Sequence, residues 1–361
     1  MMMGAQVSFN RSIPELADDL KVIQPSVLIS VPRIFERVHN QIYAKLAKES
    51  SFKQTLFNLT IDVGWRRFEY QQGTRSWHPK LLLSAVLDTL VAKSIRNNLG
   101  GCLEYVIVGG APLSSEVAKT FISLGVPLLQ GYGLTETSPV ASANTIKHNA
   151  PDSIGLPLRG VKVKIADNDE LWVQGENVMQ GYWQNEEATA ETMVNADDGV
   201  WLKTGDRASI DEKGFLRIIG RIKDILVLAN GEKMPPTDIE SAILRDPLFE
   251  QVMVLGEGKP FLSALAVLNK ATWQNLRSEK GWTDDDLSKK EVKDHVIGSI
   301  AGQMSDFPGY AKIRQVSLSL EEWTVESGLM TPTLKIKRPK IMAAHADQIE
   351  AMYAGRGVHK A

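Results

Sequence analysis

The chain has 361 residues, with 43% hydrophobic residues and a formal net charge of −2 from 41 basic and 43 acidic residues. This length favours two or more domains, and the near balance of interspersed charges argues against a nucleic-acid partner. A single cysteine excludes an internal disulfide and fits a reducing compartment, so we expect a cytoplasmic protein.

The most hydrophobic run, Leu81–Ala92, is interrupted by Asp88. It also falls short of the ~20 apolar residues that a membrane-spanning helix needs. The first residues carry no apolar core of the kind that a secretory signal has. We therefore expect no transmembrane segment, and peripheral contact with a membrane stays open.

The first half of the chain alternates helical and strand patterns. Apolar side chains recur at three- and four-residue spacings, as in Leu83, Val86, Leu87, Leu90 and Val91, which predicts amphipathic helices. Short β-branched or apolar runs predict strands that end at glycines. We expect helices over 33–60, 80–99 and 116–123, and strands over 105–108 and 126–129. This order is typical of an α/β sheet that binds ligands where its strands end.

A different sequence pattern, of short alternating runs, begins near residue 155. Alternating runs over 161–165 and 170–173 predict antiparallel β structure. After Gly220-Arg221, a strand over 225–228 and a helix over 239–245 indicate a new domain. We predict an α/β (α+β) protein, with a large domain over 1–220 and a small α+β domain over 221–361.

The string GYGLTETSP, Gly131–Pro139, places two glycines, an aromatic ring, a hydroxyl and a carboxylate on one turn. Backbone without Cβ at Gly131 and Gly133 can pass close to a ligand ring, and Tyr132 can lie against a purine. Thr135 can donate to a phosphate oxygen, and Glu136 can hold Mg²⁺, because hard cations take carboxylate oxygen. A lone polar turn is the ordinary alternative for Gly-Tyr-Gly, but the whole string favours a nucleotide site.

Two further strings carry charge. In WLKTGD, Asp206 follows Thr-Gly, and an exposed carboxylate after a tight turn suits the two hydroxyls of a ribose. An aspartate in a turn is more often only a turn residue, but the spacing to Arg221 favours a site. TPTLKIKRP, Thr331–Pro339, predicts a loop crowded with cations, which could also be a solvated face.

Together and in this order, the strings resemble the adenylate-forming (AMP-binding) superfamily of acyl-CoA synthetases, luciferases and adenylation domains. SVPRIFERV, VIVGGAPLS and MTPTLKIKR resemble its long-chain acyl-CoA synthetase branch. The resemblance implies a long-chain fatty acid–CoA ligase that uses ATP, Mg²⁺ and coenzyme A and passes through acyl-AMP. Its substrates would be a fatty acid, ATP and CoA.

By position, the resemblance assigns roles to particular residues. Thr135 would contact phosphate, Glu136 would hold Mg²⁺, and Lys335 would contact the carboxylate and α-phosphate, with Lys337 as its rival. Lys223 would be the hinge of a mobile small domain, and Gly231 would border the CoA tunnel. Gly109 would line the acyl and adenine pocket. The nucleotide site would comprise Gly110, Ala111, Gly131, Tyr132, Gly133, Thr135, Asp206 and Arg221.

One family feature is absent from the sequence. No Ser/Thr/Gly-rich phosphate loop ending in Pro-Lys-Gly occurs between residues 1 and 361. We therefore expect an incomplete large domain, with exposed sheet edges and apolar faces, and little acyl-AMP formation by the chain alone.

Three interpretations stay open at this point. The first is a truncated or split ligase whose remaining part an upstream polypeptide supplies, and we favour it. The second is a shortened enzyme that forms thioesters from preformed acyl-AMP. The third is a non-catalytic protein that binds nucleotide or acyl groups.

Overall fold

A computed structural model describes residues 4–12, 15–305, 307–331 and 334–354, except for the side chain of Lys223. It divides the chain into two compact units. The first runs to Thr204 and adds Ala208–Ile218; the second comprises Gly205–Arg207 and the chain from Ile219 onward.

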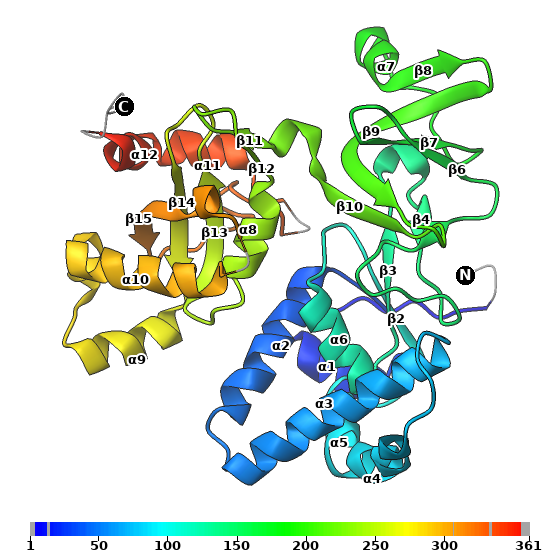
Figure 1. Ribbon diagram of the computed structural model, residues 1–361, viewed down its shortest axis with the longest axis horizontal. Helices are drawn as coiled ribbons and strands as arrows, with labels where there is room; N and C mark the ends of the chain where they lie inside the picture. Colours follow the sequence, from blue (N-terminus) through cyan, green and yellow to red (C-terminus); the bar gives the residue numbers. More distant parts are fainter. Residues whose placement is uncertain (1–3, 13–14, 306, 332–333, 355–361) are drawn as a thin grey trace. The chain divides into compact units, whose positions relative to one another are not determined.

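The first unit is built on a sheet of order β1-β2-β3-β4-β5 (Figure 1). Its first three strands pair in parallel, with Val106 opposite both Leu28 and Leu128. The last two strands are short and antiparallel. The strands are β1 (Val27–Ser30), β2 (Tyr105–Val108), β3 (Leu128–Tyr132), β4 (Ser142–Ala143) and β5 (Leu156–Pro157). The strand predicted over 105–108 is confirmed, and the next begins two residues later than predicted.

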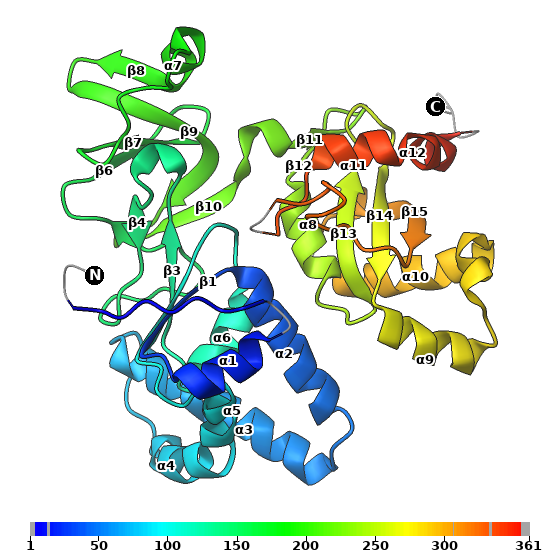
Figure 2. The same cartoon turned by 180° about the vertical axis from the view of Figure 1, so that it is seen from behind.

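Helices cover one face of this sheet, and α2 and α6 lie side by side in Figures 1 and 2. The rings of Phe35 on α2 and Phe121 on α6 meet edge to face at 4.9 Å between centroids, in the core of the unit. The helices are α1 (Leu16–Ile23), α2 (Pro32–Leu46), α3 (Ser51–Gln71), α4 (Ser84–Leu87), α5 (Lys93–Asn98) and α6 (Ser115–Ser123). A 3₁₀ turn, Pro79–Leu83, precedes α4, and a π-helical segment, Asp88–Ala92, follows it.

The predicted helices are present, with two corrections. The helix expected over 33–60 is broken between α2 and α3. The apolar stripe of the 80–99 region is only partly buried: Leu87 packs inside, whereas Val86 and Leu90 are 58% and 62% exposed. Spacing predicted the helix correctly, but it could not tell which apolar face meets the core.

The opposite face of the parallel sheet carries apolar side chains that solvent reaches. Ile29 on β1 is 78% exposed, and Val27 and Ile107 are each 37% exposed. Their neighbours Val106 and Val108 point the other way and are fully buried, as the alternation of a strand requires. An exposed apolar face of this sheet was predicted, and the structure confirms it.

The remainder of the first unit centres on a sheet of order β10-β9-β7-β6, with β8 beside β9. β6 and β7 pair antiparallel, with Val163 opposite Val173, which confirms the predicted antiparallel structure. The elements are β6 (Lys162–Ile165), β7 (Glu170–Gln174), α7 (Glu186–Thr192), β8 (Met193–Ala196), β9 (Gly199–Ile210) and β10 (Leu216–Arg221). Of these, Gly205–Arg207 of β9 and Ile219–Arg221 of β10 belong to the second unit.

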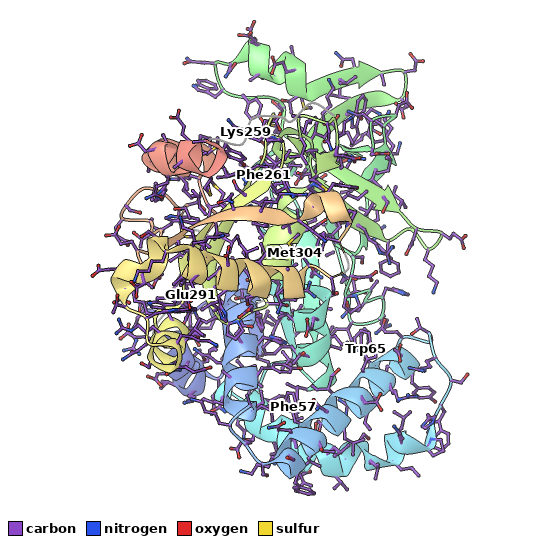
Figure 3. All side chains as sticks on the ribbon, turned by 60° about the vertical axis from the view of Figure 1, so that its left-hand side comes forward. Phe57, Trp65, Lys259, Phe261, Glu291 and Met304 are labelled. Atoms are coloured by element: carbon purple, nitrogen blue, oxygen red, sulfur yellow. The ribbon has the colours of Figure 1, made fainter. Side chains whose placement is uncertain are left out.

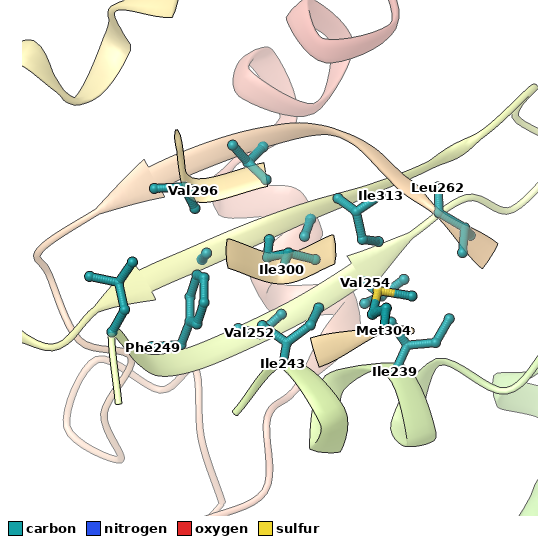
Figure 4. Close-up of a cluster of buried hydrophobic side chains, with 14 of the residues drawn as sticks. Ile239, Ile243, Phe249, Val252, Val254, Leu262, Val296, Ile300, Met304 and Ile313 are labelled. Atoms are coloured by element: carbon teal, nitrogen blue, oxygen red, sulfur yellow. The ribbon is translucent and has the colours of Figure 1, made fainter. Parts of the chain in front are cut away.

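The second unit has a three-stranded sheet of order β13-β14-β15 that is covered by helices. Figure 4 shows side chains of α8 and α10, among them Ile239 and Ile300, packing on Val252 and Val254 of β13. The main elements are α8 (Pro236–Ile243), β13 (Phe249–Leu255), β14 (Leu262–Leu268), α9 (Lys270–Lys280), α10 (Lys290–Gln303), β15 (Ile313–Ser319), α11 (Arg338–Ala344) and α12 (Ala346–Tyr353). A short pair, β11 (Leu226–Val227) and β12 (Lys233–Met234), precedes them.

The C-terminal helix is held by an aromatic contact. The ring of Tyr353 lies 5.1 Å from that of Phe261, and the ammonium of Lys259 lies 5.0 Å from the Tyr353 ring (Phe261 and Lys259 are labelled in Figure 3). Ser263 shares a 2.6 Å hydrogen bond with the Tyr353 hydroxyl. These contacts fix α12 against the beginning of β14.

Cys102, the one cysteine of the sequence, is exposed. Among the described residues, no helix has the length and apolar character needed to cross a membrane.

Close packing of α3 on α6 depends on Gly64. A Cβ placed there would lie 2.0 Å from the carbonyl oxygen of Ser123, whereas one placed on the helical Gly298 of α10 would meet no atom within 4 Å. We expect Gly64→Ala to lower the free energy of unfolding by about 1–3 kcal/mol, because the helices must separate.

The matched change Gly298→Ala should raise the free energy of unfolding by about 0.5–1 kcal/mol, because alanine restricts the unfolded chain. Urea unfolding followed by circular dichroism measures both. Equal effects of the two substitutions would contradict the close approach of α3 and α6.

Candidate active site

Two glycine turns follow neighbouring strands of the parallel sheet and come together. Gly109, Gly110 and Ala111 follow β2, and Gly131 lies near the end of β3. A Cβ on Gly109 would lie 3.2 Å from the carbonyl oxygen of Gly131, and Gly110 has a φ of +85°. Parallel strands end at the same edge, so the exposed Gly110 and Ala111 and the half-buried Gly109 and Gly131 lie at the edge of the sheet where such folds accept ligands.

The turn after β3 folds back tightly on itself. A Cβ on Gly133 would lie 1.8 Å from the carbonyl oxygen of Pro139. The buried Thr137 hydroxyl accepts from the Leu134 amide at 2.9 Å and holds the 3₁₀ turn Thr135–Thr137. Thr135 is therefore presented to solvent, and Glu136 is half-buried beside it. Tyr132 is half-buried too, against the cluster that contains Leu171.

A segment that the sequence did not single out braces this turn. The Tyr182 hydroxyl donates to Glu136 Oε1 at 2.6 Å, and the Met179 amide donates to the Glu136 carbonyl at 2.8 Å. Asn177 donates to the carbonyl of Thr137 at 3.0 Å. The hydrogen bond to Glu136 raises the pKa of Tyr182, because the phenol donates to a carboxylate. The aromatic pair Tyr182-Trp183 after Gly181 was the only sequence signal for this brace.

The structure corrects the prediction for Asp206. It lies inside the twelve-residue strand β9 and not after a tight turn. Its side chain is only 7% exposed, although it was predicted to be exposed. Gly205, with a φ of +72°, is the irregularity that the sequence pattern took for a turn. Arg221 Nε donates to Asp206 Oδ1 at 3.0 Å, so the predicted spacing does bring the two residues together.

Lys335 sits in a small hairpin in the second unit. Met330 and Ile336 form a bridge, the Thr331 amide donates to the Lys335 carbonyl at 2.8 Å, and the Lys335 amide donates to Thr331 Oγ1 at 3.0 Å. Lys335 is exposed as a residue, although its ammonium is partly removed from water. Lys337 lies at the hairpin's base, where its amide donates to the Leu329 carbonyl at 2.8 Å. Residues 332 and 333 of the same string lie outside the described residues.

The charges of Asp206 and Arg221 both affect the pKa of Lys335. Partial removal from water lowers the pKa of Lys335, the Arg221 guanidinium lowers it further, and the Asp206 carboxylate acts in the opposite direction. All three residues belong to the second unit. The fold thus brings Asp206 and Arg221 into contact, and their charges act on Lys335, which comes from a distant string of the sequence.

The remaining predicted residues lie on the segment that follows β10. The backbone of Lys223 is in the 3₁₀ turn Ile222–Asp224, and its side chain is outside the description. Gly231 turns the chain between β11 and β12 with a φ of +86°, and its amide donates to the Leu228 carbonyl at 2.8 Å.

The described residues include no cluster of three or more His, Cys, Asp or Glu side chains that could hold a metal ion. Glu136 is therefore a single carboxylate donor. That donor set suits Mg²⁺, which keeps several waters and is held by one or two carboxylates together with the phosphates of a substrate. It does not suit a resident metal held by protein ligands alone.

Solved structures of adenylation domains share this fold. The adenylation domain of a carboxylate reductase from Mycobacterium chelonae matches with a TM-score of 0.70 at 22% identity, over 95% of this chain and 48% of that chain. The adenylation domain of the Segniliparus rugosus carboxylic acid reductase, solved with AMP and a co-purified carboxylic acid, matches with a TM-score of 0.68 at 22% identity, over 95% and 49%.

The profile described as AMP-binding enzyme matches residues 1–183, and the one described as AMP-binding enzyme C-terminal domain matches residues 223–357. The chain belongs to the AMP-binding enzyme family. The long-chain-fatty-acid–CoA ligase FadD15 of Mycobacterium bovis is 32% identical to it over 368 residues, which cover 96% of this chain and 58% of that protein. The chain thus spans little more than half the length of this curated relative.

The charges around Lys335 give a test of the cluster. Arg221→Gln should raise the pKa of Lys335, because a like charge is removed, and Asp206→Asn should lower it, because an opposite charge is removed. The pH dependence of Lys335 acylation by an amine reagent, followed by peptide mass spectrometry, measures both changes. Lys340 is the internal control, and its profile should stay the same in the two variants. Shifts of the same sign in both variants would contradict the cluster.

Proposed function

We propose that the chain carries the chemistry of a long-chain fatty acid–CoA ligase. In this reaction a fatty acid carboxylate attacks the α-phosphate of ATP, which gives acyl-AMP and diphosphate, and the thiol of CoA then displaces AMP. The hydrogen bond between Arg221 and Asp206, whose charges act on Lys335, is the main support. The name of the mycobacterial relative supports the acyl substrate.

The first proposed step joins negative charges. Attack of a carboxylate on a phosphate needs cations and backbone donors held in place before the reaction, since their reorganisation would otherwise add to the barrier. Lys335 would contact the fatty acid carboxylate and the α-phosphate. Its lowered pKa reflects an ammonium that is partly out of water, where its attraction for a new anion is stronger.

Asp206 would accept from the two ribose hydroxyls. The hydrogen bond from Arg221 supports this role, because it holds the carboxylate in a fixed direction. Arg221 would lie beside the nucleotide. We propose that the glycine turns, Tyr132 and Thr135 complete the nucleotide site, through Gly110, Ala111, Gly131 and Gly133.

Glu136 would hold Mg²⁺ with the nucleotide phosphates. The metal supplies charge neutralisation on the phosphate oxygens when bound. Tyr182, which donates to Glu136 Oε1, fixes the direction of this carboxylate and leaves its second oxygen for a ligand.

The domain roles are proposed from the resemblance. Residues 1–220 would contribute to a large nucleotide-binding domain, and residues 221–361 would form a small domain that turns about Lys223. The positive φ of Gly231, in an exposed turn, supports a close backbone approach by the pantetheine of CoA. Such rotation would exchange the lysine for the Gly231 turn between the two half-reactions.

AMP binding tests the ribose assignment. We expect the chain to bind AMP weakly, and Asp206→Ala to weaken this binding by about tenfold or more, because hydrogen bonds to a charged group are worth ~1.5–3 kcal/mol. Titration calorimetry measures the affinity. Asp152→Ala is the control, since Asp152 also pairs with an arginine but is 57% exposed. If Asp206→Ala binds AMP as tightly as the unmodified chain, the assignment of Asp206 to the ribose hydroxyls is wrong.

Lys335, rather than Lys337, should act in acyl-AMP formation. In a fusion that places the upstream region of the mycobacterial relative before this chain, Lys335→Ala should lower acyl-AMP formation by about 10²-fold, the loss typical of one transition-state charge contact. Pyrophosphate release measures this step, and thioester formation from synthetic palmitoyl-AMP and CoA should change much less. A larger loss with Lys337→Ala, or equal loss in both steps, would show the assignment to be wrong.

A further inference from the structure

A buried ion pair lies next to the hairpin that carries Lys335. Arg338 Nη2 donates to Glu240 at 2.6 Å to Oε1 and 2.6 Å to Oε2. Arg338 Nη1 donates to the Val254 carbonyl at 3.2 Å, and the Val254 amide donates to Glu240 Oε1 at 2.7 Å. The side chains of Arg338 and Glu240 are 21% and 10% exposed. These bonds join α8, β13 and the first residue of α11 in one closed group.

This group holds one end of the hairpin, and a second group holds the other. Arg338 directly follows Lys337, whose amide closes the base of the hairpin on Leu329. On the other side, Gln251 of β13 donates to the Met330 sulfur at 3.2 Å and to the Trp323 carbonyl at 2.8 Å. The side chains of Leu329, Leu334 and Ile336 pack on the apolar cluster between these two points. Lys335 lies between these two anchors in the sequence.

Stability alone does not account for the Arg338–Glu240 pair. Taking two charges out of water costs about as much as their attraction returns, and well-packed apolar residues are often equally stable in such a place. A guanidinium whose two terminal nitrogens bond a carboxylate and a carbonyl does fix direction, because its donors have a rigid geometry. The pair therefore orients the backbone at Arg338, which continues directly from the hairpin.

We propose that Arg338 is a positioning residue, which through Glu240 and the Val254 carbonyl holds the hairpin so that Lys335 is presented to the reacting carboxylate and phosphate. This inference rests on the ligase function proposed above. Arg338 would touch neither substrate. It acts on the reaction only through the place of Lys335.

The double variant Arg338→Met/Glu240→Leu tests the proposal without leaving a buried charge unpaired. Its thermal unfolding midpoint should stay near that of the unmodified chain, because two apolar side chains fill the same space. In the fusion described above, acyl-AMP formation should fall by about 10²-fold in kcat with a small change in KM, since a displacement of ~1 Å of a catalytic group can have this effect. Thioester formation from palmitoyl-AMP should be unaffected.

A readout that needs no ligase activity accompanies this measurement. Acylation of Lys335 in the chain itself should shift to higher pH in the double variant, because the ammonium leaves the partly dry surroundings and the Arg221 charge that lower its pKa. The acylation profile of Arg338→Lys should lie between those of the unmodified chain and the double variant, since an ammonium cannot make all the bonds that the guanidinium makes to Glu240 and Val254. Lys340→Met, an exposed charge loss on the same helix, is the matched control and should leave both readouts unchanged.

The outcomes separate the two proposals. If Lys335→Ala has no effect on acyl-AMP formation, the ligase role of Lys335 fails, and the acylation profile alone then decides whether Arg338 positions the hairpin. If Lys335→Ala acts as expected but the double variant retains full acyl-AMP formation and an unshifted profile, the positioning role is overturned. Equal losses in the double variant and in Lys340→Met would also overturn it.

Discussion

A carboxylate that is removed from water needs an ion-pair or hydrogen-bond partner, and two such carboxylates determine the contacts around Lys335 in the second unit. Asp206 and Glu240 are both nearly buried, and each is bonded by an arginine. Burial raises the pKa of Glu240, and the Arg338 guanidinium and the Val254 amide oppose that rise because both stabilise the ionised form. Arg338 cannot be replaced alone without taking the guanidinium partner away from the Glu240 carboxylate. The surroundings of Lys335 follow from where these pairs are placed.

The sequence was most informative where local chemistry decides structure. The run Tyr105–Val108 with its two following glycines predicted a strand that ends at a backbone surface, and the structure has this arrangement. The spacing of Asp206 to Arg221 predicted a pair, and the hairpin of β9 and β10 brings the two side chains to 3.0 Å. Alternation and turn residues carry such information because hairpin partners are near in sequence.

The failures have physical causes as well. Thr-Gly-Asp resembles a turn, but a single glycine with positive φ can lie inside a strand that continues on both sides of it. The Arg338–Glu240 pair spans 98 positions, and in the sequence Arg338 was one cation in a basic run. Tyr182 is likewise 46 positions from Glu136. Contacts at such separations are set by packing of whole elements, which periodicity does not encode.

The exposed Cys102 has a consequence for handling the protein. It lies on the surface, and it is the only thiol in the 361 residues. Oxidation in air can therefore link two chains through one disulfide, but no sulfhydryl is left to extend the product. Aged samples without a reducing agent would show a band of doubled mass on a non-reducing gel, and no covalent ladder above it.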